Sequence, residues 1–178
     1  MAKNWAPEID EITKDFVSSF GHLSSEQLNF KPNNKVWSIA QNIEHLIIIN
    51  ESYFPLFDKL NAGKFSTPLL GRIKWFANFI GNSILKSVDP ENLKKVKTFP
   101  SWQPSKSEID SDIVEQFANH QEELKVKLEK CGKSVDSGII IHSPVNTKIV
   151  YSLEKAIEII VTHERRHFNQ ASKIVNEM

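Results

Sequence analysis

Apolar residues recur every three or four positions over most of this chain, and this spacing constrains the fold more than any other feature of the sequence. The period matches the roughly 3.6 residues of an α-helical turn, so each such stretch has one face to bury. Stretches that alternate with a period of two, as half-buried strands do, are scarce. The sequence therefore predicts an all-α protein.

Four long helices are expected, and the antiparallel four-helix bundle is the simplest way to bury their apolar faces together. The helices are predicted at about residues 5–20, 38–60, 107–131 and 151–176. Ser38 and Gln41 match a capping box at the start of the second helix, and Pro55 is expected to kink that helix or to end it early. A chain of 178 residues suits a single domain that spans its whole length.

The connection between the second and third long helices is predicted to be long, irregular and partly helical. A helix is expected over Leu69–Leu85, although Gly71 and Gly81 weaken it. Residues 22–37 are expected to form a polar connection, and residues 138–142 a short extended piece before Pro144.

Composition excludes several classes of function. The 22 basic and 22 acidic residues balance, so the chain lacks the basic field that nucleic acid requires. The longest apolar run, Leu46–Ile49, is far too short to span a membrane, and the N-terminus is too polar for a signal peptide. Cys131 is the single cysteine, which suits a reducing compartment. We expect a cytoplasmic protein that acts on a small molecule, with no nucleic-acid or membrane partner.

The segment His163–His167 matches the motif H-E-x-x-H, which places two histidines one helical turn apart. Chance predicts roughly 0.02 such matches in this chain, given its six histidines. On the predicted last helix, Glu164 and His167 fall within the apolar stripe, His163 lies at its edge, and Arg165 and Arg166 face solvent. Burying such groups is costly unless a metal ion or a satisfied polar cluster compensates them, and both interpretations stay open.

A zinc protease is rejected because a third ligand is missing downstream. The extended protease motif needs Gly and His where this chain has Gln170 and Lys173, and eleven residues follow His167. A third ligand is therefore sought upstream, among four candidates: His22, His45, His120 and His142. We expect His22 to be exposed and His120 to be a hydrogen-bonded core residue. His45 is the best candidate, because apolar residues enclose it within the second helix.

The chain resembles the DinB-like family of metal-binding four-helix bundles. The resemblance rests on Trp37-Ser38-Ile39 with His45-Leu46, and on Leu153–Ala156 leading into His163, His167 and Gln170. The segment from His142 to Lys148 and the prolines around Trp102 add to it. The resemblance implies that His45, His163 and His167 bind a divalent metal, zinc or nickel. It also implies, for some relatives, transfer or isomerisation chemistry with a low-molecular-weight thiol (bacillithiol, mycothiol or glutathione), whereas many relatives have no assigned activity.

Three neutral histidines leave a divalent ion with an open position, where a thiol or a water loses its proton near neutral pH. Glu164 is predicted to accept a proton or to support a ligand. Gln170 is predicted to orient a bound molecule or to form a hydrogen bond within the bundle, and His142 to line the mouth of a pocket or to lie in a plain loop. Cys131 lies at the C-terminal end of a helix, where the dipole disfavours a thiolate, so we do not expect a nucleophile there.

Three functional hypotheses follow. The leading one is a metal-dependent S-transferase that uses a low-molecular-weight thiol. The alternatives are a metal-dependent hydrolase with Glu164 as base, and a non-catalytic, stress-related protein that binds a metal or another ligand. The aromatic residues Trp75, Phe76 and Phe79 are predicted to lie in the core rather than to line the pocket, with a homodimer contact as another role.

Overall fold

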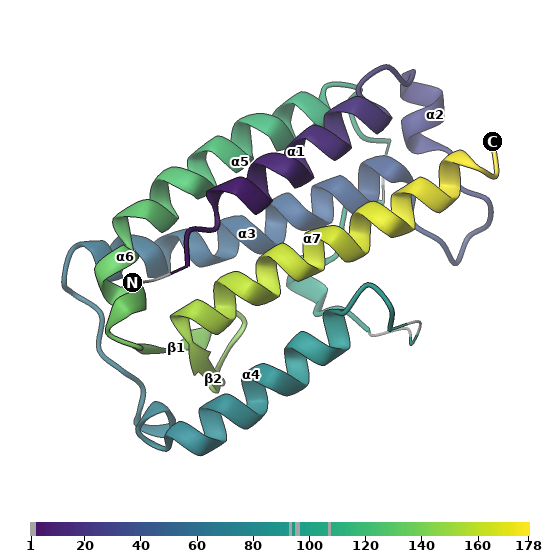
Figure 1. Cartoon of the computed structure of the whole chain (residues 1–178). Helices are drawn as coiled ribbons and strands as arrows, with labels where there is room; N and C mark the ends of the chain where they lie inside the picture. Colours follow the sequence, from purple (N-terminus) through teal and green to yellow (C-terminus); the bar gives the residue numbers. More distant parts are fainter. Residues whose placement is uncertain (1–2, 93, 95–96, 107) are drawn as a thin grey trace.

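The computed structural model describes residues 3–92, 94, 97–106 and 108–178, and these residues are mostly helical (Figure 1). The α-helices are α1 (Ala6–Phe20), α2 (Ser25–Asn29), α3 (Ile39–Asn61), α4 (Lys74–Val88), α5 (Ile113–Lys130), α6 (Gly132–Asp136) and α7 (Leu153–Val175). Two 3-10 turns, η1 (Leu69–Arg72) and η2 (Pro100–Trp102), and two strands, β1 (Ile140–Ser143) and β2 (Asn146–Ser152), complete the described elements. The predicted helical class is confirmed, with the addition of a small sheet.

The core lies where the apolar faces of α1, α3, α5 and α7 meet. Each of these helices contacts two of the others, because α1 and α3 both pack against α5 and α7. All four helices contribute large apolar side chains that are buried in this core, among them Phe16, Phe20, Phe57, Phe117, Leu124 and Ile157. The apolar residues that recur with helical spacing in the sequence therefore form the faces that are buried in this core.

Neighbouring helices do not alternate in direction throughout, contrary to the antiparallel prediction. Phe54 stacks on His120, and Asp58 pairs with Lys127, so residue numbers rise together along α3 and α5. Helices α1 and α7 also run in the same direction, whereas α1 and α5 are antiparallel, as are α3 and α7 (Figure 1). The reason is the connection from α3 to α5. It contains α4 and returns along the length of the molecule, so α5 starts at the same end as α3 (Figure 1).

Two predicted helix boundaries are wrong and one is confirmed. Helix α3 ends at Asn61, close to the predicted residue 60, and continues past Pro55 instead of ending early there. Pro55 and Glu51, whose carbonyl loses its helical partner, are both exposed residues, so water can take over that hydrogen bond. Helix α4 starts at Lys74, because η1 occupies the preceding residues. The third long helix starts at Ile113, and the predicted start at Ser107 lies outside the described residues.

Helix α2 and strand β2 are absent from the sequence-based prediction, whereas the extended piece predicted at residues 138–142 overlaps β1. Helix α2 interrupts the predicted polar connection, and Ser24 caps it through a capping box with Gln27. The strands β1 and β2 form an antiparallel hairpin in which Ile141 is opposite Tyr151. Tyr151 therefore belongs to β2, and α7 starts two residues later than expected, at Leu153.

Helix α4 packs against α7 and β2, on the side of α7 that faces away from α1 and α5 (Figure 1). Small residues allow this close approach. A Cβ atom at Gly81 would lie 2.7 Å from Cγ of Lys155 and 3.1 Å from Cβ of Tyr151. No helix in the described part of the chain is both long enough and apolar enough to cross a membrane.

Candidate metal centre

Helices α3 and α7 bring the imidazoles of His45, His163 and His167 together. The two α7 histidines lie one turn apart, and their Nε2 atoms are 3.0 Å apart. The ring of His45 comes from the facing helix, with its centroid 5.2 Å from that of His163 and 4.7 Å from that of His167. One nitrogen from each ring falls within 4.8 Å of the others. The structure thus places the three predicted ligands in one cluster.

The backbone of η2 fixes the orientation of His45. Its Nδ1 donates to the carbonyl oxygen of Trp102 at 2.5 Å. Trp102 is held in turn by its indole N–H, which donates to Oγ of Ser52 at 3.2 Å. Since Nδ1 carries the proton, the lone pair of His45 Nε2 is free to bind a metal.

Asn42 fixes His167 in the same way. Nδ1 of His167 donates to Oδ1 of Asn42 at 2.7 Å. The amide nitrogen of Asn42 donates to the backbone carbonyl of Ser38 at 2.8 Å, which sets the orientation of the amide. Hydrogen bonds of this kind are typical of histidines that bind metals, because they hold the tautomer and the ring plane.

Burial keeps all three imidazoles neutral. It lowers the pKa of His45 to about 4, and the hydrogen bond to Trp102 only partly opposes this effect. Burial also lowers the pKa values of His163 and His167 well below the ordinary range. Charge repulsion from the other imidazoles and from Arg166 adds to the shift, because it disfavours a further positive charge. The ring of Trp37 covers His45 and stacks on His167, which adds to the desolvation. A neutral imidazole is the form that binds a metal.

The residues present fit a divalent ion. Two ligands at the usual Zn–N distance and a tetrahedral angle are separated by roughly 3.4 Å, close to the 3.0 Å between the Nε2 atoms of His163 and His167. Without a metal, the same distance is a hydrogen bond, and it requires Nε2 of His163 to carry a proton, because Nδ1 of His167 already does. Metal binding requires the opposite tautomer of His163. The two states are therefore chemically distinct.

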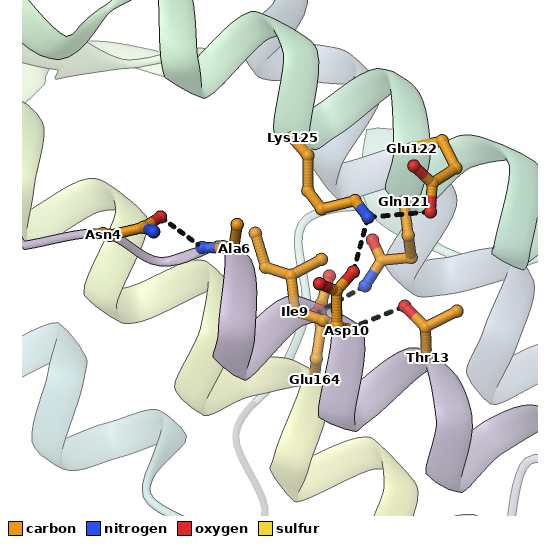
Figure 2. Close-up of polar contacts among 9 residues, drawn as sticks. All are labelled: Asn4, Ala6, Ile9, Asp10, Thr13, Gln121, Glu122, Lys125 and Glu164. Carbon is orange, nitrogen blue, oxygen red and sulfur yellow. Dashed lines mark hydrogen bonds and ion pairs between the residues drawn. The ribbon is translucent and has the colours of Figure 1, made fainter.

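Glu164 points away from this cluster. Its carboxylate is fully buried and accepts from the amide of Asn50 at 2.7 Å and from that of Gln121 at 3.0 Å. Figure 2 shows the Gln121 amide reaching this carboxylate from α5. Burial raises the pKa of Glu164 to about 7, although both amides oppose the shift. The middle residue of the motif is thus part of the packed interior.

The two arginines of the motif hold other segments in place, although the sequence predicted that they face solvent. Arg165 forms ion pairs with Glu11 and Asp15 of α1. The Arg166 guanidinium donates to the backbone carbonyls of Asp89, Asn92 and Lys94, at 2.5–2.9 Å. Both side chains are half-buried, because the segment after α4 and helix α1 flank α7 at this level.

A cavity of about 660 Å³ opens beside the three histidines. Its walls come from α3, α7, the C-terminal half of α4 and the segment that follows it. The apolar part of the lining includes Trp37, Ile49, Ile84, Phe99, Trp102 and Ile160. Lys35, Lys97, Arg166 and Lys173 add basic groups, against the single acidic residue Glu177. The hydroxyls of Tyr53 and Tyr151, 2.6 Å apart, also belong to the lining.

The other predicted site residues fall in different places. Gln170 lines the cavity, but His142 does not; it lies on β1, where its Nδ1 donates to the carbonyl of Ser143 at 2.9 Å. His22 is exposed, as predicted. His120 is buried, but neither ring nitrogen has a hydrogen-bond partner among the described residues, contrary to prediction. Its ring instead stacks on Phe54, at a centroid distance of 5.2 Å.

The predictions for the aromatic residues of α4 and for Cys131 differ in outcome. Trp75 and Phe79 are largely exposed, so the expected core position is wrong for both, and neither lines the cavity. Phe76 packs against a small buried cluster that includes Ala77 and Val150. Cys131 is the C-cap of α5, and burial raises the pKa of its thiol to about 11, in agreement with the expectation that it is not a nucleophile.

Sequence reasoning missed Asn42 and the backbone of Trp102 as supports of the site. Asn42 lies four residues after the N-cap Ser38 and three before His45, so its place on the same helical face as His45 was available from the spacing. The contact of Trp102 spans 57 residues and depends on how the long connection folds back. No local pattern indicates it.

Comparison with known protein families matches residues 8–171 to the DinB superfamily. No curated protein and no solved structure matches the chain. The matched region includes all three histidines and most of the cavity lining, and it confirms the resemblance drawn from the sequence. The chain belongs to the DinB superfamily.

Proposed function

We propose that this protein binds a divalent metal ion through His45, His163 and His167, within a four-helix bundle formed by α1, α3, α5 and α7. We further propose that it is a cytoplasmic S-transferase that joins a low-molecular-weight thiol to an electrophilic small molecule. The observation that carries the proposal is the position of three neutral imidazoles, two with a fixed tautomer, on the wall of a cavity. When bound, a divalent ion lowers the pKa of a thiol or a water that reaches it.

The protein's own residues provide orientation and charge. Trp102 and Asn42 hold two ligand rings in place, so little reorganisation accompanies metal binding. Lys35, Lys97 and Lys173 line the same cavity and suit the carboxylates of glutathione or bacillithiol. The apolar walls exclude water and suit an apolar electrophile.

The hydrolase alternative has less support, because Glu164 was its proposed base. The Glu164 carboxylate does not line the cavity, and it accepts hydrogen bonds from the amides of Asn50 and Gln121. A general base must reach the proton that it removes within hydrogen-bond distance or through one water. A non-catalytic protein remains the alternative that the following experiments test against the transferase.

The first experiment measures metal content. Protein purified without a polyhistidine tag should contain about one divalent ion per chain by elemental analysis, and His45→Ala should contain far less. The matched control is His22→Ala, because His22 is exposed and distant from the cluster in sequence. Near-zero metal in the wild type after incubation with zinc or nickel, together with unchanged stability of His45→Ala, would contradict metal binding.

The second experiment measures activity. Metal-loaded protein is mixed with a model electrophile and with bacillithiol, mycothiol or glutathione in turn, and the conjugate is quantified by mass spectrometry. The transferase proposal expects conjugation with at least one thiol, lost in His45→Ala and kept in His22→Ala. If metal binds but no thiol is conjugated, the transferase is rejected and the metal-binding, non-catalytic alternative is supported.

A further inference from the structure

An exposed apolar patch lies on η1 and on the first two turns of α4. We define it by five residues: Leu69, Leu70, Ile73, Trp75 and Phe79. Leu69, Trp75 and Phe79 are 76%, 72% and 63% exposed. Single exposed apolar residues are ordinary, but five of them within residues 69–79, a tryptophan and a phenylalanine included, indicate a surface that contacts a binding partner.

The packing of α4 explains why this face is free. The helix turns Ala77 and Gly81 toward β2 and α7, where both are buried. Trp75 and Phe79 are one turn apart on the other side, and α4 is the outermost long helix on its side of the molecule (Figure 1). No described element covers them, and they do not line the cavity next to the histidines.

The charge of the segment that carries the patch is of one sign. Residues 59–88 contain five basic and no acidic residues, although about four acidic residues are expected in 30, since 22 of 178 are acidic. The residues of β1 and β2, which pack against η1 and α4, add Lys148 and no acidic residue. Within the described part of the chain, Lys64, Arg72, Lys74 and Lys86 form no ion pair.

We infer that this surface docks onto an anionic lipid membrane. Aromatic and aliphatic side chains flanked by unpaired basic residues fit the boundary between the acyl chains and anionic headgroups, and each basic group near such a surface adds to binding. A second copy of the chain fits less well, because a symmetric contact brings the same basic residues of both copies together without acidic partners. The proposed contact is peripheral, made by side chains of η1 and α4 alone, and it departs from the sequence-based expectation of no membrane partner.

The test uses the full chain with vesicles of phosphatidylcholine alone or of phosphatidylcholine and phosphatidylglycerol in equal amounts. The wild type should sediment with the anionic vesicles and stay in solution with the neutral ones. High salt should weaken the binding, because the headgroup charge is then screened.

Two double variants separate the apolar and the charged contributions. Trp75→Ser with Phe79→Ser removes the aromatic side chains, and Arg72→Gln with Lys74→Gln removes two charges. Each pair should lower the vesicle partition coefficient by on the order of tenfold or more. The matched control, Lys130→Gln with Lys133→Gln, removes two exposed charges from α5 and α6 and should change little. Circular dichroism melting confirms that the exposed substitutions leave each variant folded.

Three outcomes would overturn the inference. The first is no sedimentation of the wild type with anionic vesicles. The second is vesicle binding that neither double variant reduces. The third is a wild-type dimer in light scattering that becomes a monomer in Trp75→Ser with Phe79→Ser, since a second copy then covers the patch. None of these measurements depends on the metal or on the proposed transferase activity.

Discussion

Two buried polar clusters lie back to back on α7, and consecutive residues of one motif belong to different clusters. His163 and His167 join His45 at the wall of a cavity, whereas Glu164 joins Asn50 and Gln121 in the packed interior. In the first cluster, hydrogen bonds to Asn42 and Trp102 hold the Nδ1 atoms of two rings, and the Nε2 atoms of His163 and His167 lie 3.0 Å apart. In the second cluster, each oxygen of the Glu164 carboxylate accepts a hydrogen bond from a side-chain amide.

The comparison shows that an H-E-x-x-H match on a helix need not act as one unit. Successive residues on an α-helix point about 100° apart, so the glutamate faces a different neighbour from the two histidines. The histidines face an open volume, and the glutamate faces two other helices. The following predictions test this division of roles, from the largest expected effect to the smallest.

Removing a histidine should have the largest effect on metal binding. Loss of a residue that only hydrogen-bonds to a metal ligand lowers metal affinity by roughly 10- to 100-fold. His163→Ala or His167→Ala removes a ligand itself and should lower the affinity by more than that. Glu164→Gln should bind metal like the wild type, because its side chain faces the other cluster. Isothermal titration with zinc or nickel measures both. A large loss of metal affinity in Glu164→Gln would contradict this division, because it would show that both clusters contribute to metal binding.

Removing the carboxylate should instead affect folding. Glu164→Ala leaves the amides of Asn50 and Gln121 without their acceptor and opens a cavity in the core. We expect a loss of about 4 kcal/mol in the free energy of unfolding. Urea denaturation at pH 6 of metal-free protein measures it. A loss below about 1 kcal/mol would show that the interior cluster contributes little to stability.

The pH dependence of stability should separate Glu164 from the histidines. The pKa of Glu164 is raised to about 7 in the folded protein, so the native state binds more protons than the unfolded one between its ordinary pKa of 4.5 and 7. Its contribution therefore falls as pH rises through this window, by about 3 kcal/mol in total. The difference in unfolding free energy between the wild type and Glu164→Gln should follow this trend, since the contributions of the histidines cancel. A difference that is constant with pH would contradict the raised pKa.

The support behind His167 should have an intermediate effect. Asn42→Ala removes the acceptor of the His167 Nδ1 proton and should lower metal affinity by about 10- to 100-fold. Asn42→Asp keeps an acceptor at that position and should retain more of the affinity. Zinc titration of the two variants compares them, and equal affinities in Asn42→Ala and the wild type would exclude the supporting role.

The smallest effect concerns His120, a buried histidine that belongs to neither cluster. Both of its nitrogens lack partners among the described residues, so His120→Leu should stabilise the protein by about 1 kcal/mol at pH 7. Burial lowers the pKa of His120 to about 4, so the wild type loses stability as pH falls from about 6.5 to 4 and the advantage of the variant grows. Thermal melts at pH 7 and pH 5 measure both effects. Destabilisation at both pH values would point to a buried partner of His120.

The sequence predicted the features that depend on local spacing. The inward position of His163 and His167 followed from one helical turn, and the choice of His45 followed from the apolar residues around it. The burial of Phe16 and Phe20 on one face of α1 was predicted from the same helical spacing. Ser24 and Gln27 form a capping box, a pattern that is also local and indicates the start of α2.

Features that depend on distant contacts could not be predicted in this way. Glu164 was expected near the metal because its helical position shows only that it is buried, and not which side chains face it. Its partners Asn50 and Gln121 come from two other helices. The direction of α5 depends on the path of a connection that includes α4, and no pattern within α5 records that path. The exposure of Trp75 likewise follows from which side of α4 packs on β2.

The hydrogen bonds of Arg166 have a consequence for which substitutions the cavity wall tolerates. The guanidinium binds three backbone carbonyls in the segment after α4, and every amino acid supplies such a carbonyl. The anchor therefore does not depend on the Lys94 side chain, whereas Asn92 also holds the segment through its own amide, which donates to the carbonyls of Lys86 and Ser87. Replacing Lys94 should leave this wall of the cavity in place, whereas loss of the Arg166 guanidinium would leave three backbone carbonyls without their donor at once.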